Sequence, residues 1–269
     1  TVAGNSTIEN TTRNAQYILK LLNRADISVY SGAEKPLERE LVQAVSHGKS
    51  GLEGIDPTNP ANLTGDAVAK MISLVEATPD ITIITLGPLT NIAQAIQKAP
   101  DTMKRVKEIV MMGGAIRVPG NQNRVAEFNI FVDPEAADTV FRFPVKKTLV
   151  PLDACNHVKL QIEDFEGITD PKLKGPILAM MGSFIRNVSD DQGVKAALMY
   201  DPLTVYYVLN PSLCTAREYD VAIETKGEIT RGMTVADLRL KSERQPNTTV
   251  VEHIPVENFK EDFVKALNS

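Results

Sequence analysis

The stretch that decides the fold is Lys-Glu-Ile-Val-Met-Met-Gly-Gly-Ala-Ile-Arg-Val-Pro-Gly-Asn at residues 107–121. Its first six residues, 107–112, form a short apolar run that predicts a buried strand. The Gly113-Gly114 pair that follows lets the backbone turn tightly and approach a ligand. A buried strand that ends in such a loop is typical of α/β folds, in which ligands bind beyond the carboxyl ends of the strands.

Other apolar runs and helical periodicities place this strand in a larger pattern. Short apolar runs predict further buried strands at 27–30, 81–86 and 145–150. Apolar residues at helical spacing predict helices at 8–23, 64–78, 89–98, 173–188 and 202–209. Late strands are expected at 219–225 and 247–254. Strands and helices that alternate in this way predict an α/β fold with an open, mostly parallel sheet flanked by helices, and residues 1–269 are predicted to form one domain.

Composition and charge exclude several partners. The 269-residue chain has a net charge of −5 with scattered basic residues, which argues against nucleic acid or an anionic membrane surface. No apolar run approaches the roughly 18 residues that span a bilayer. Cys155 and Cys214 lie far apart without metal-ligand spacing. They predict reduced thiols and a cytoplasmic location.

Polar residues gather just after the strand at 107–112. Asn121, Glu127 and Asn129 follow its glycine pair, and amides and carboxylates together both donate and accept hydrogen bonds. They could converge on a hydroxyl-rich ligand, but a polar surface loop fits these residue types equally well. Asp133 before Pro134 is instead typical of an N-cap with proline at the first helical position.

Three further loops carry chemically useful residues. Residues 86–91 (Leu-Gly-Pro-Leu-Thr-Asn) form a strand–turn–helix junction that by itself predicts a well-capped helix start. Residues 47–54 are glycine-rich and contain His47, one of three histidines, but their spacing is not that of a Walker phosphate loop. Asp201, in Met-Tyr-Asp-Pro at 199–202, opens a predicted helix. Taken alone, His47 predicts an incidental loop histidine and Asp201 a plain N-cap.

In order and spacing, these loops resemble those of the inosine–uridine-preferring nucleoside hydrolases over nearly the whole chain. One such motif would be weak evidence, whereas several in register are specific. The stretches that carry the resemblance are Thr1-Val2-Ala3-Gly4-Asn5, His47 to Gly54, Leu86 to Asn91, Met112-Gly113-Gly114, Asn121 to Asn129, Asp201-Pro202, Glu224-Thr225 and Thr230 to Val235. The first of them, residues 1–5, looks like the family's second strand and its Gly-Asn turn, so the resemblance implies a strand there.

The resemblance implies an enzyme that splits ribonucleosides, its small-molecule substrates, into ribose and free base. Asp201 and the backbone carbonyl of Leu86 would bind Ca²⁺, since hard oxygen donors suit this ion. A water on that metal would attack the anomeric carbon. Asn129, Tyr200 and Asp201 would be catalytic, and a homodimer or homotetramer is expected. The substrate-binding residues would be Asn121, Glu127 and Asn129 at the ribose hydroxyls, Met112 beside the sugar, Asn5 near the same pocket, and His47 and Tyr200 at the base.

Two departures from the family pattern matter. The family begins with a strand ending in Asp-x-Asp-Pro-Gly-x-Asp-Asp, which supplies two metal ligands and the general base. This sequence starts after that motif, so we expect it to be part of a longer protein. Many members also place histidine just before the aspartate corresponding to Asp201 and use it to protonate the leaving base.

Here that position is Tyr200, whose phenol, with a usual pKa of about 10, is a poor proton donor at neutral pH. The purine-specific branch of the family has an aromatic residue there that stacks on the base, so Tyr200 favours purine nucleosides. Two alternatives stay open. One is a nucleoside- or ribose-binding protein of the same fold that has lost turnover. The other is a glycosidase for a modified nucleoside or a nicotinamide riboside.

Overall fold

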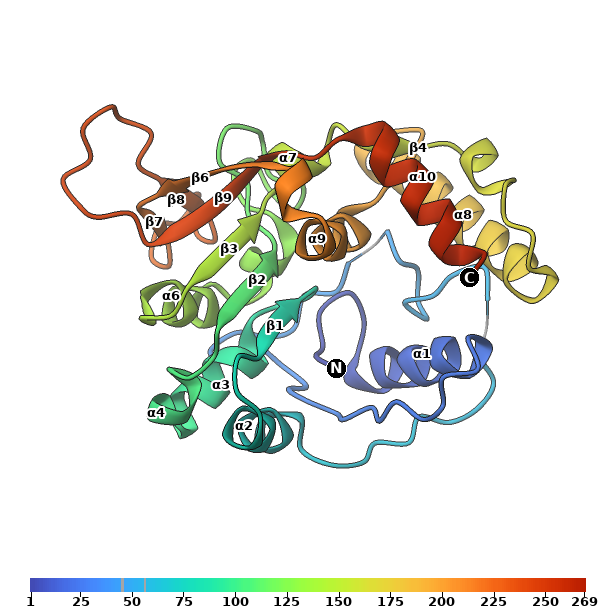
Figure 1. Cartoon of the computed structure of the whole chain (residues 1–269), viewed down its shortest axis with the longest axis horizontal. Helices are drawn as coiled ribbons and strands as arrows, with labels where there is room; N and C mark the ends of the chain where they lie inside the picture. The colour runs from blue at the N-terminus through green and yellow to red at the C-terminus, as the bar shows by residue number, and fades with distance from the viewer. Residues whose placement is uncertain (45, 56) are drawn as a thin grey trace.

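The computed structural model describes residues 1–44, 46–55 and 57–269. At its centre is a five-stranded sheet that crosses the molecule diagonally in Figure 1. In spatial order its strands are β1 (Thr82–Thr85), β2 (Glu108–Met112), β3 (Lys147–Val150), β9 (Thr248–His253) and β6 (Thr215–Tyr219). The first four strands are parallel to their neighbours and β6 is antiparallel to β9, which confirms the mostly parallel sheet.

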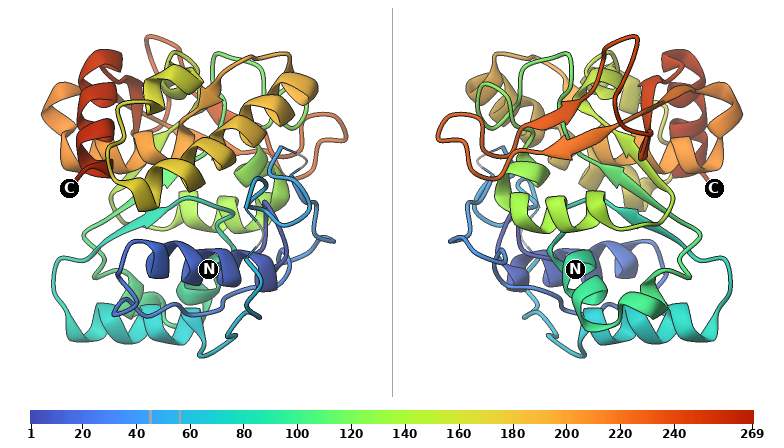
Figure 2. Two further views of the ribbon diagram at one scale, coloured as in Figure 1. Left: turned by 90° about the vertical axis from the view of Figure 1, so that its right-hand side faces the viewer. Right: turned by 90° about the vertical axis from the view of Figure 1, so that its left-hand side faces the viewer.

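Helices cover both faces of this sheet (Figures 1 and 2). They are α1 (Ile8–Leu21), α2 (Ala67–Ala77), α3 (Thr90–Lys98), α4 (Pro100–Met103), α5 (Phe128–Val132), α6 (Pro134–Arg142), α7 (Leu152–Cys155), α8 (Pro171–Gln192), α9 (Tyr200–Leu209) and α10 (Val256–Leu267). Short 3₁₀ helices occur at Ile162–Phe165 and Pro211–Leu213. Two small antiparallel pairs are β4 (Lys159–Leu160) with β5 (Ala197–Leu198), and β7 (Val221–Ile223) with β8 (Thr234–Ala236).

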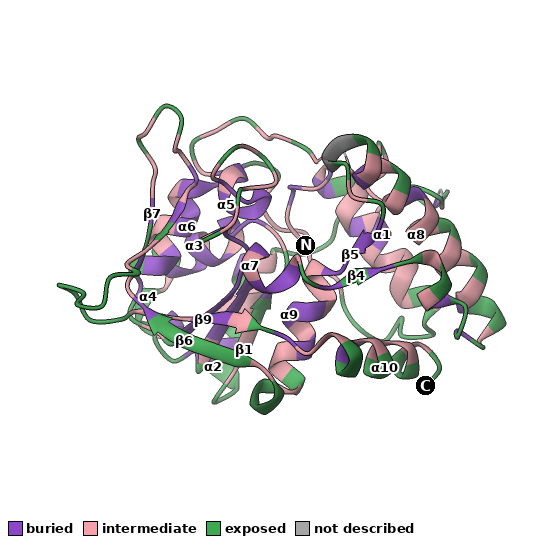
Figure 3. Cartoon of the chain, turned by 90° about the horizontal axis from the view of Figure 1, so that it is seen from above, coloured by how far each residue is buried: buried purple, intermediate pink, exposed green. Residues whose placement is uncertain are grey.

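Strand side chains alternate between two hydrophobic cores. Because successive residues of a strand point to opposite faces, Ile109 and Met111 pack with α2, α3 and α6, whereas Val110 packs with α7 to α10. Figure 3 shows the inner strands buried and β6 largely exposed at the sheet edge. The continuous apolar run of β2 therefore follows from burial on both faces, and it carries Met112 to the end of the strand.

The predicted strands at 1–5 and 27–30 are wrong. The Thr1 amino group donates to the Tyr30 carbonyl at 2.7 Å and the Ala3 N–H donates to the Ala33 carbonyl at 2.9 Å. These isolated bonds do not build a ladder, and among the described residues no ladder joins either segment to β1. The late strand predicted at 219–225 is confirmed as the shorter β7 (Val221–Ile223), which pairs with β8 and not with the central sheet.

Helix starts differ in how they are capped. Asp133 caps α6 as predicted, because its carboxylate accepts from the Ala136 N–H at 3.1 Å. The prediction for α3 is wrong: its N-cap is Leu89, without a side-chain bond, and the Thr90 hydroxyl instead donates to Asp133 at 2.6 Å. Helix α9 begins at Tyr200, so Asp201 lies inside the first turn and is not the N-cap.

Two chemical expectations concern the whole chain. Both cysteines are free in the structure, as predicted, with Cys155 buried and Cys214 half-buried. Over the described ranges, the structure contains no helix with the length and apolar character needed to cross a membrane.

Candidate active site

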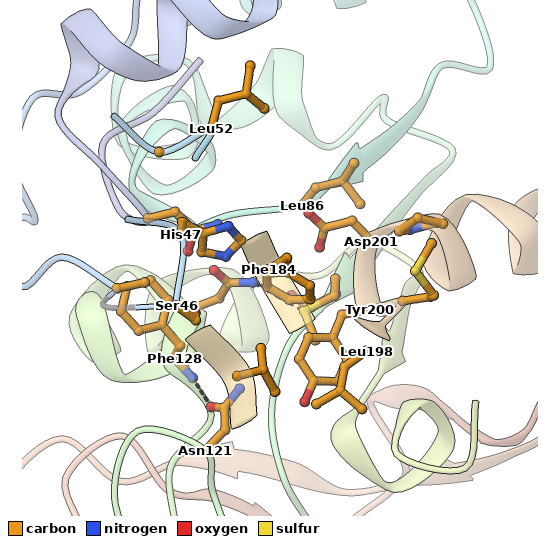
Figure 4. Close-up of a pocket in the computed structure, with 18 of the residues that line it drawn as sticks. Ser46, His47, Leu52, Leu86, Asn121, Phe128, Phe184, Leu198, Tyr200 and Asp201 are labelled. Carbon is orange, nitrogen blue, oxygen red and sulfur yellow. Dashed lines mark hydrogen bonds between the residues drawn. The ribbon is translucent and has the colours of Figure 1, made fainter. Parts of the chain in front are cut away.

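A cavity of about 360 Å³ lies where β1 and β2 end (Figure 4). Leu86 follows β1, Met112 ends β2, and the start of α9 completes this part of the wall. Every residue to which the family resemblance gave a role lines this one cavity: Asn5, His47, Leu86, Met112, Asn121, Glu127, Asn129, Tyr200 and Asp201. The structure thus brings together residues that are spread over nearly 200 positions of sequence.

Glu127 is a fixed carboxylate in the cavity wall. Its side chain accepts from the N–H groups of Gly114 at 3.0 Å, Asn129 at 2.9 Å and Ile130 at 3.2 Å, and so caps α5. The residue is only 2% exposed. This burial raises the pKa of Glu127 to about 7, although the backbone hydrogen bonds oppose the rise. The result is an acceptor whose position is set by backbone atoms on two sides.

The two asparagines present opposite hydrogen-bonding atoms. Asn121 Oδ1 accepts from the Phe128 N–H at 2.9 Å, which leaves its Nδ2 group as a donor (Figure 4). Asn129 Nδ2 donates to the Met112 carbonyl at 3.3 Å and lies 3.2 Å from the Met112 sulfur, which leaves Oδ1 as an acceptor. Since a hydroxyl group both donates and accepts, these amides and Glu127 match a ligand with several hydroxyls.

Asp201 and Leu86 lie side by side at another part of the wall (Figure 4). Within the described ranges, no hydrogen bond or ion pair is recorded for the Asp201 carboxylate. Burial and, secondly, the charge of Glu127 raise the pKa of Asp201 to about 7. A desolvated carboxylate without a partner is costly, and a cation would remove that cost.

The oxygen donors at this point suit a hard cation in chemistry. The Asp201 carboxylate and the Leu86 carbonyl are the ligand types that Ca²⁺ prefers, but Ca²⁺ takes about six to eight oxygens. Across the residues that the structure describes, no cluster of three or more His, Cys, Asp or Glu side chains is arranged for a metal. The described chain therefore fits a partial Ca²⁺ site that needs further oxygen ligands.

Tyr200 contributes its ring to the cavity. Its hydroxyl donates to Asn156 Oδ1 at 3.4 Å, a partner that sequence reasoning missed. Burial raises the pKa of Tyr200 well above its usual value, with smaller contributions from the charges of Cys155 and Glu127. The phenol therefore keeps its proton at neutral pH and is a weak acid toward a leaving base.

The far end of the cavity is apolar and was not predicted. His47 packs against Phe184 with ring centroids 5.4 Å apart, and burial lowers the pKa of His47 to about 4, so the ring is neutral. The other apolar residues of this wall come from the glycine-rich loop, α8 and β5: Leu52, Met180, Met181, Val188 and Leu198. The helical spacing of Met180, Met181 and Phe184 is the only sequence signal, and it equally predicts ordinary core packing.

Hydrogen bonds from one side chain of α8 join this helix to the glycine-rich loop and to the residue that precedes it. Asn187 Nδ2 donates to Glu53 Oε2 at 2.7 Å and to the Ser46 carbonyl at 3.1 Å. Gly54 lies so close to α8 that a Cβ at this position would clash with the Ala179 carbonyl oxygen. The loop and the helix thus form one wall around the apolar end of the cavity.

A parallel sheet with this cavity at the carboxyl ends of its strands defines an α/β protein whose cavity wall matches a small molecule with several hydroxyls. The family model described as inosine-uridine preferring nucleoside hydrolase matches residues 1–261, and the chain belongs to that family. It is therefore a nucleoside hydrolase by family, as the loop motifs predicted.

Named relatives agree with this assignment. The pyrimidine-specific ribonucleoside hydrolase RihA of Shigella boydii serotype 4 is 39% identical over 267 residues, covering 96% of this chain and 85% of the relative. RihA of Escherichia coli K12 shows the same identity and coverage.

Solved structures resemble the fold closely. The purine-preferring ribonucleoside hydrolase from Gardnerella vaginalis has a TM-score of 0.89 at 28% identity, covering 99% of this chain and 88% of its own. The plant nucleoside hydrolase PpNRh1 has a TM-score of 0.90 at 29% identity with the same coverage.

Proposed function

We propose that this protein hydrolyses the N-glycosidic bond of ribonucleosides to ribose and free base with the help of Ca²⁺, and that it prefers purine nucleosides. The observation that carries the proposal is one cavity that joins the hydroxyl-matching set Asn121, Glu127 and Asn129 to the Asp201–Leu86 oxygen pair. Family membership supports the reaction class.

At the ribose end of the cavity, different side chains donate to and accept from the sugar hydroxyls. Asn121 donates to a sugar hydroxyl, whereas Asn129 and Glu127 accept from hydroxyls. The backbone bonds to Glu127 prevent these groups from moving, so their contacts can strengthen as the sugar distorts toward a transition state with oxocarbenium character. Met112 packs beside the sugar and holds Asn129 in place.

The metal end is built on Asp201 and Leu86, which would hold Ca²⁺ through a carboxylate and a carbonyl oxygen. When bound, the ion orients a water molecule and lowers its pKa. Asp201 lies in the first turn of α9, and its desolvation, which raises its pKa, favours the binding of a cation beside the carboxylate.

The base end combines an aromatic face with an apolar wall. Stacking of a base on an aromatic ring is worth about 1–3 kcal/mol, and the larger purine ring system covers more of Tyr200, which supports the purine preference. The neutral His47 and Phe184 close the other side. The named relatives include both a pyrimidine-specific and a purine-preferring enzyme, so base preference is the part that needs measurement.

The test is ribose release from inosine, adenosine, guanosine, uridine and cytidine by the full-length protein, with added Ca²⁺ and with chelator. We expect turnover that the chelator abolishes and a faster reaction with purines. Turnover that persists with chelator would remove the Ca²⁺ part, and faster pyrimidine hydrolysis would remove the purine part.

One second function has an observation in its favour. Tyr200 retains its proton at neutral pH, and among the described residues no cluster of three or more His, Cys, Asp or Glu side chains is arranged to hold a metal. A nucleoside-binding protein without turnover would show tight nucleoside binding and no base release. The predicted cytoplasmic location and homodimeric or homotetrameric state stay predictions.

A further inference from the structure

The loop at residues 115–126 delivers Asn121 to the cavity, yet it contains no helix or strand. Its internal bonds are local: Asn123 Oδ1 accepts from the N–H groups of Val125 at 2.9 Å and Ala126 at 2.7 Å. These bonds shape the turn but do not attach it to the sheet. The side chain of Asn121 is held at the far end of the loop, where its Oδ1 accepts from the Phe128 N–H at 2.9 Å. The path of the backbone that brings Asn121 there also depends on what holds the start of the loop.

The start of the loop is held by α7, which follows β3. Asp153 Oδ2 accepts from the Ile116 N–H at 2.9 Å, and its Oδ1 accepts from the Arg117 N–H at 2.7 Å. One position earlier on α7, the Leu152 N–H donates to the Gly114 carbonyl at 2.9 Å. Charge-assisted bonds of this kind are roughly twice as strong as neutral ones, and here both oxygens of one carboxylate are used on consecutive amides.

Packing links the same helix to the rest of the site. Leu152 belongs to a small buried cluster with Met112 and Ala115, against which Val118 and Tyr200 pack. The cluster contains the end of β2, the start of the loop and the aromatic residue at the base end. A shift of the loop relative to α7 would therefore change the packing at these three parts of the site.

The start of the loop has a second attachment, through the side chain of Arg117. It donates to the Tyr219 hydroxyl at 2.7 Å and lies 3.2 Å from Glu252, on β6 and β9. This contact fixes the outer end of the side chain, whereas Asp153 fixes the backbone from which the loop departs. Arg117 is partly exposed and its ion pair is screened by solvent, so the carboxylate of Asp153 is the stronger restraint.

We propose that Asp153 is a positioning residue for sugar recognition: it sets the backbone at residues 116 and 117 so that Asn121 meets a ribose hydroxyl. Asp153 does not line the cavity and acts only through the loop. The inference rests on the proposed function, because it specifies how that site recognises ribose.

The experiment compares the best nucleoside of the panel with its 2′-, 3′- and 5′-deoxy forms, in the wild type and in Asp153→Ala. The readout is the ratio of kcat/KM for the nucleoside to kcat/KM for each deoxy form. Both substrates meet the same folded enzyme, so a smaller folded fraction leaves the ratio unchanged. We expect Asp153→Ala to reduce this ratio by about tenfold for the hydroxyl that Asn121 contacts, because small misplacements of a binding group are costly.

Two further variants make the result specific. Asp153→Asn keeps one acceptor oxygen and should restore part of the lost ratio. Asp66→Ala is the matched control: Asp66 also accepts from two backbone N–H groups, Val68 at 2.9 Å and Ala69 at 3.0 Å, but at the start of α2 and outside the cavity. Asp66→Ala should leave every ratio at the wild-type value.

Unchanged ratios for all three deoxy forms in Asp153→Ala, or equal changes in Asp66→Ala, would overturn the inference. If Asp153→Ala does not fold, the test rests on Asp153→Asn. Wild-type ratios in that variant would count against Asp153 as a positioning residue. If the wild type releases no base, the proposed function is refuted but the inference about Asp153 is still testable. The same ratios are then taken from the dissociation constants of each nucleoside and its deoxy forms.

Discussion

Glu127→Gln is the sharpest single perturbation of the site, because it keeps the shape of the side chain and removes its charge. In the structure, Glu127 Oε2 accepts from Gly114 and Ile130, whereas Oε1 accepts from Asn129. Glutamine has one acceptor oxygen. It should replace Oε2 and keep two bonds, which places its NH₂ group against the Asn129 N–H.

The cost to stability has two opposing parts. A buried N–H without an acceptor costs about 1–3 kcal/mol. Against this, burial has raised the pKa of Glu127 to about 7, so the charged form is disfavoured in the fold and the neutral amide avoids that desolvation. We expect a net loss of about 1 kcal/mol, which for a chain of this size lowers Tm by about 2–4 °C.

The cost to catalysis is larger. A hydrogen bond to a charged group is worth about 1.5–3 kcal/mol and a neutral one about 0.5–1.5 kcal/mol. The difference of roughly 1–1.5 kcal/mol corresponds to about a 5- to 15-fold lower kcat/KM, at about 1.4 kcal/mol for each factor of ten. Glu127→Ala loses the whole contact and the α5 cap, and should lose about 10- to 150-fold.

The assay is ribose release under kcat/KM conditions, with Tm measured by calorimetry on the same samples. The two readouts separate a folding effect from a binding effect, because the Tm shift of Glu127→Gln is predicted to be small. A folded Glu127→Gln and a folded Glu127→Ala that both hydrolyse nucleosides like the wild type would refute the assignment of Glu127 to the ribose hydroxyls.

Two other side chains give independent predictions. Burial lowers the pKa of His47 from 6.5 to about 4. Between these two values the unfolded chain binds a proton that the folded chain does not bind. The free energy of unfolding should therefore fall by up to about 3 kcal/mol as the pH drops from 6.5 to 4. Denaturant titrations across that range should show a shallower fall in His47→Gln, and an identical fall would contradict a buried neutral ring. Tyr200→Phe keeps the stacking face and should retain kcat/KM within about threefold, whereas Tyr200→Ala should lose about 5- to 150-fold. Loss of most activity in Tyr200→Phe would mean that the phenol proton is used.

Local patterns were enough to find β1, β2, β3 and β9. The inner strands β2 and β3 are buried on both faces and therefore leave the clearest signal, a continuous apolar run. The site residues were predicted from the resemblance of the loop motifs to the nucleoside hydrolases, because the local patterns alone fitted structural roles equally well or better. In a parallel sheet, residues that follow neighbouring strands meet at one edge, and Leu86 and Met112 follow this rule. The predictions of strands at 1–5 and 27–30 are wrong because a segment forms a strand only when it pairs with a neighbouring strand. A local sequence pattern contains no information on that neighbour.

The sequence, through its local patterns and its family resemblance, thus determined the α/β class, the parallel core of the sheet and nine of the residues that line one cavity. Only the tertiary structure decided which amide atoms of Asn121 and Asn129 face the ligand, and that Asp153 holds the sugar loop. It alone placed α8 at the base end, where Asn187 meets Glu53 across 134 positions of sequence. The physical reason is that burial and periodicity are properties of neighbouring residues, whereas the direction of a hydrogen bond depends on partners that folding brings from elsewhere.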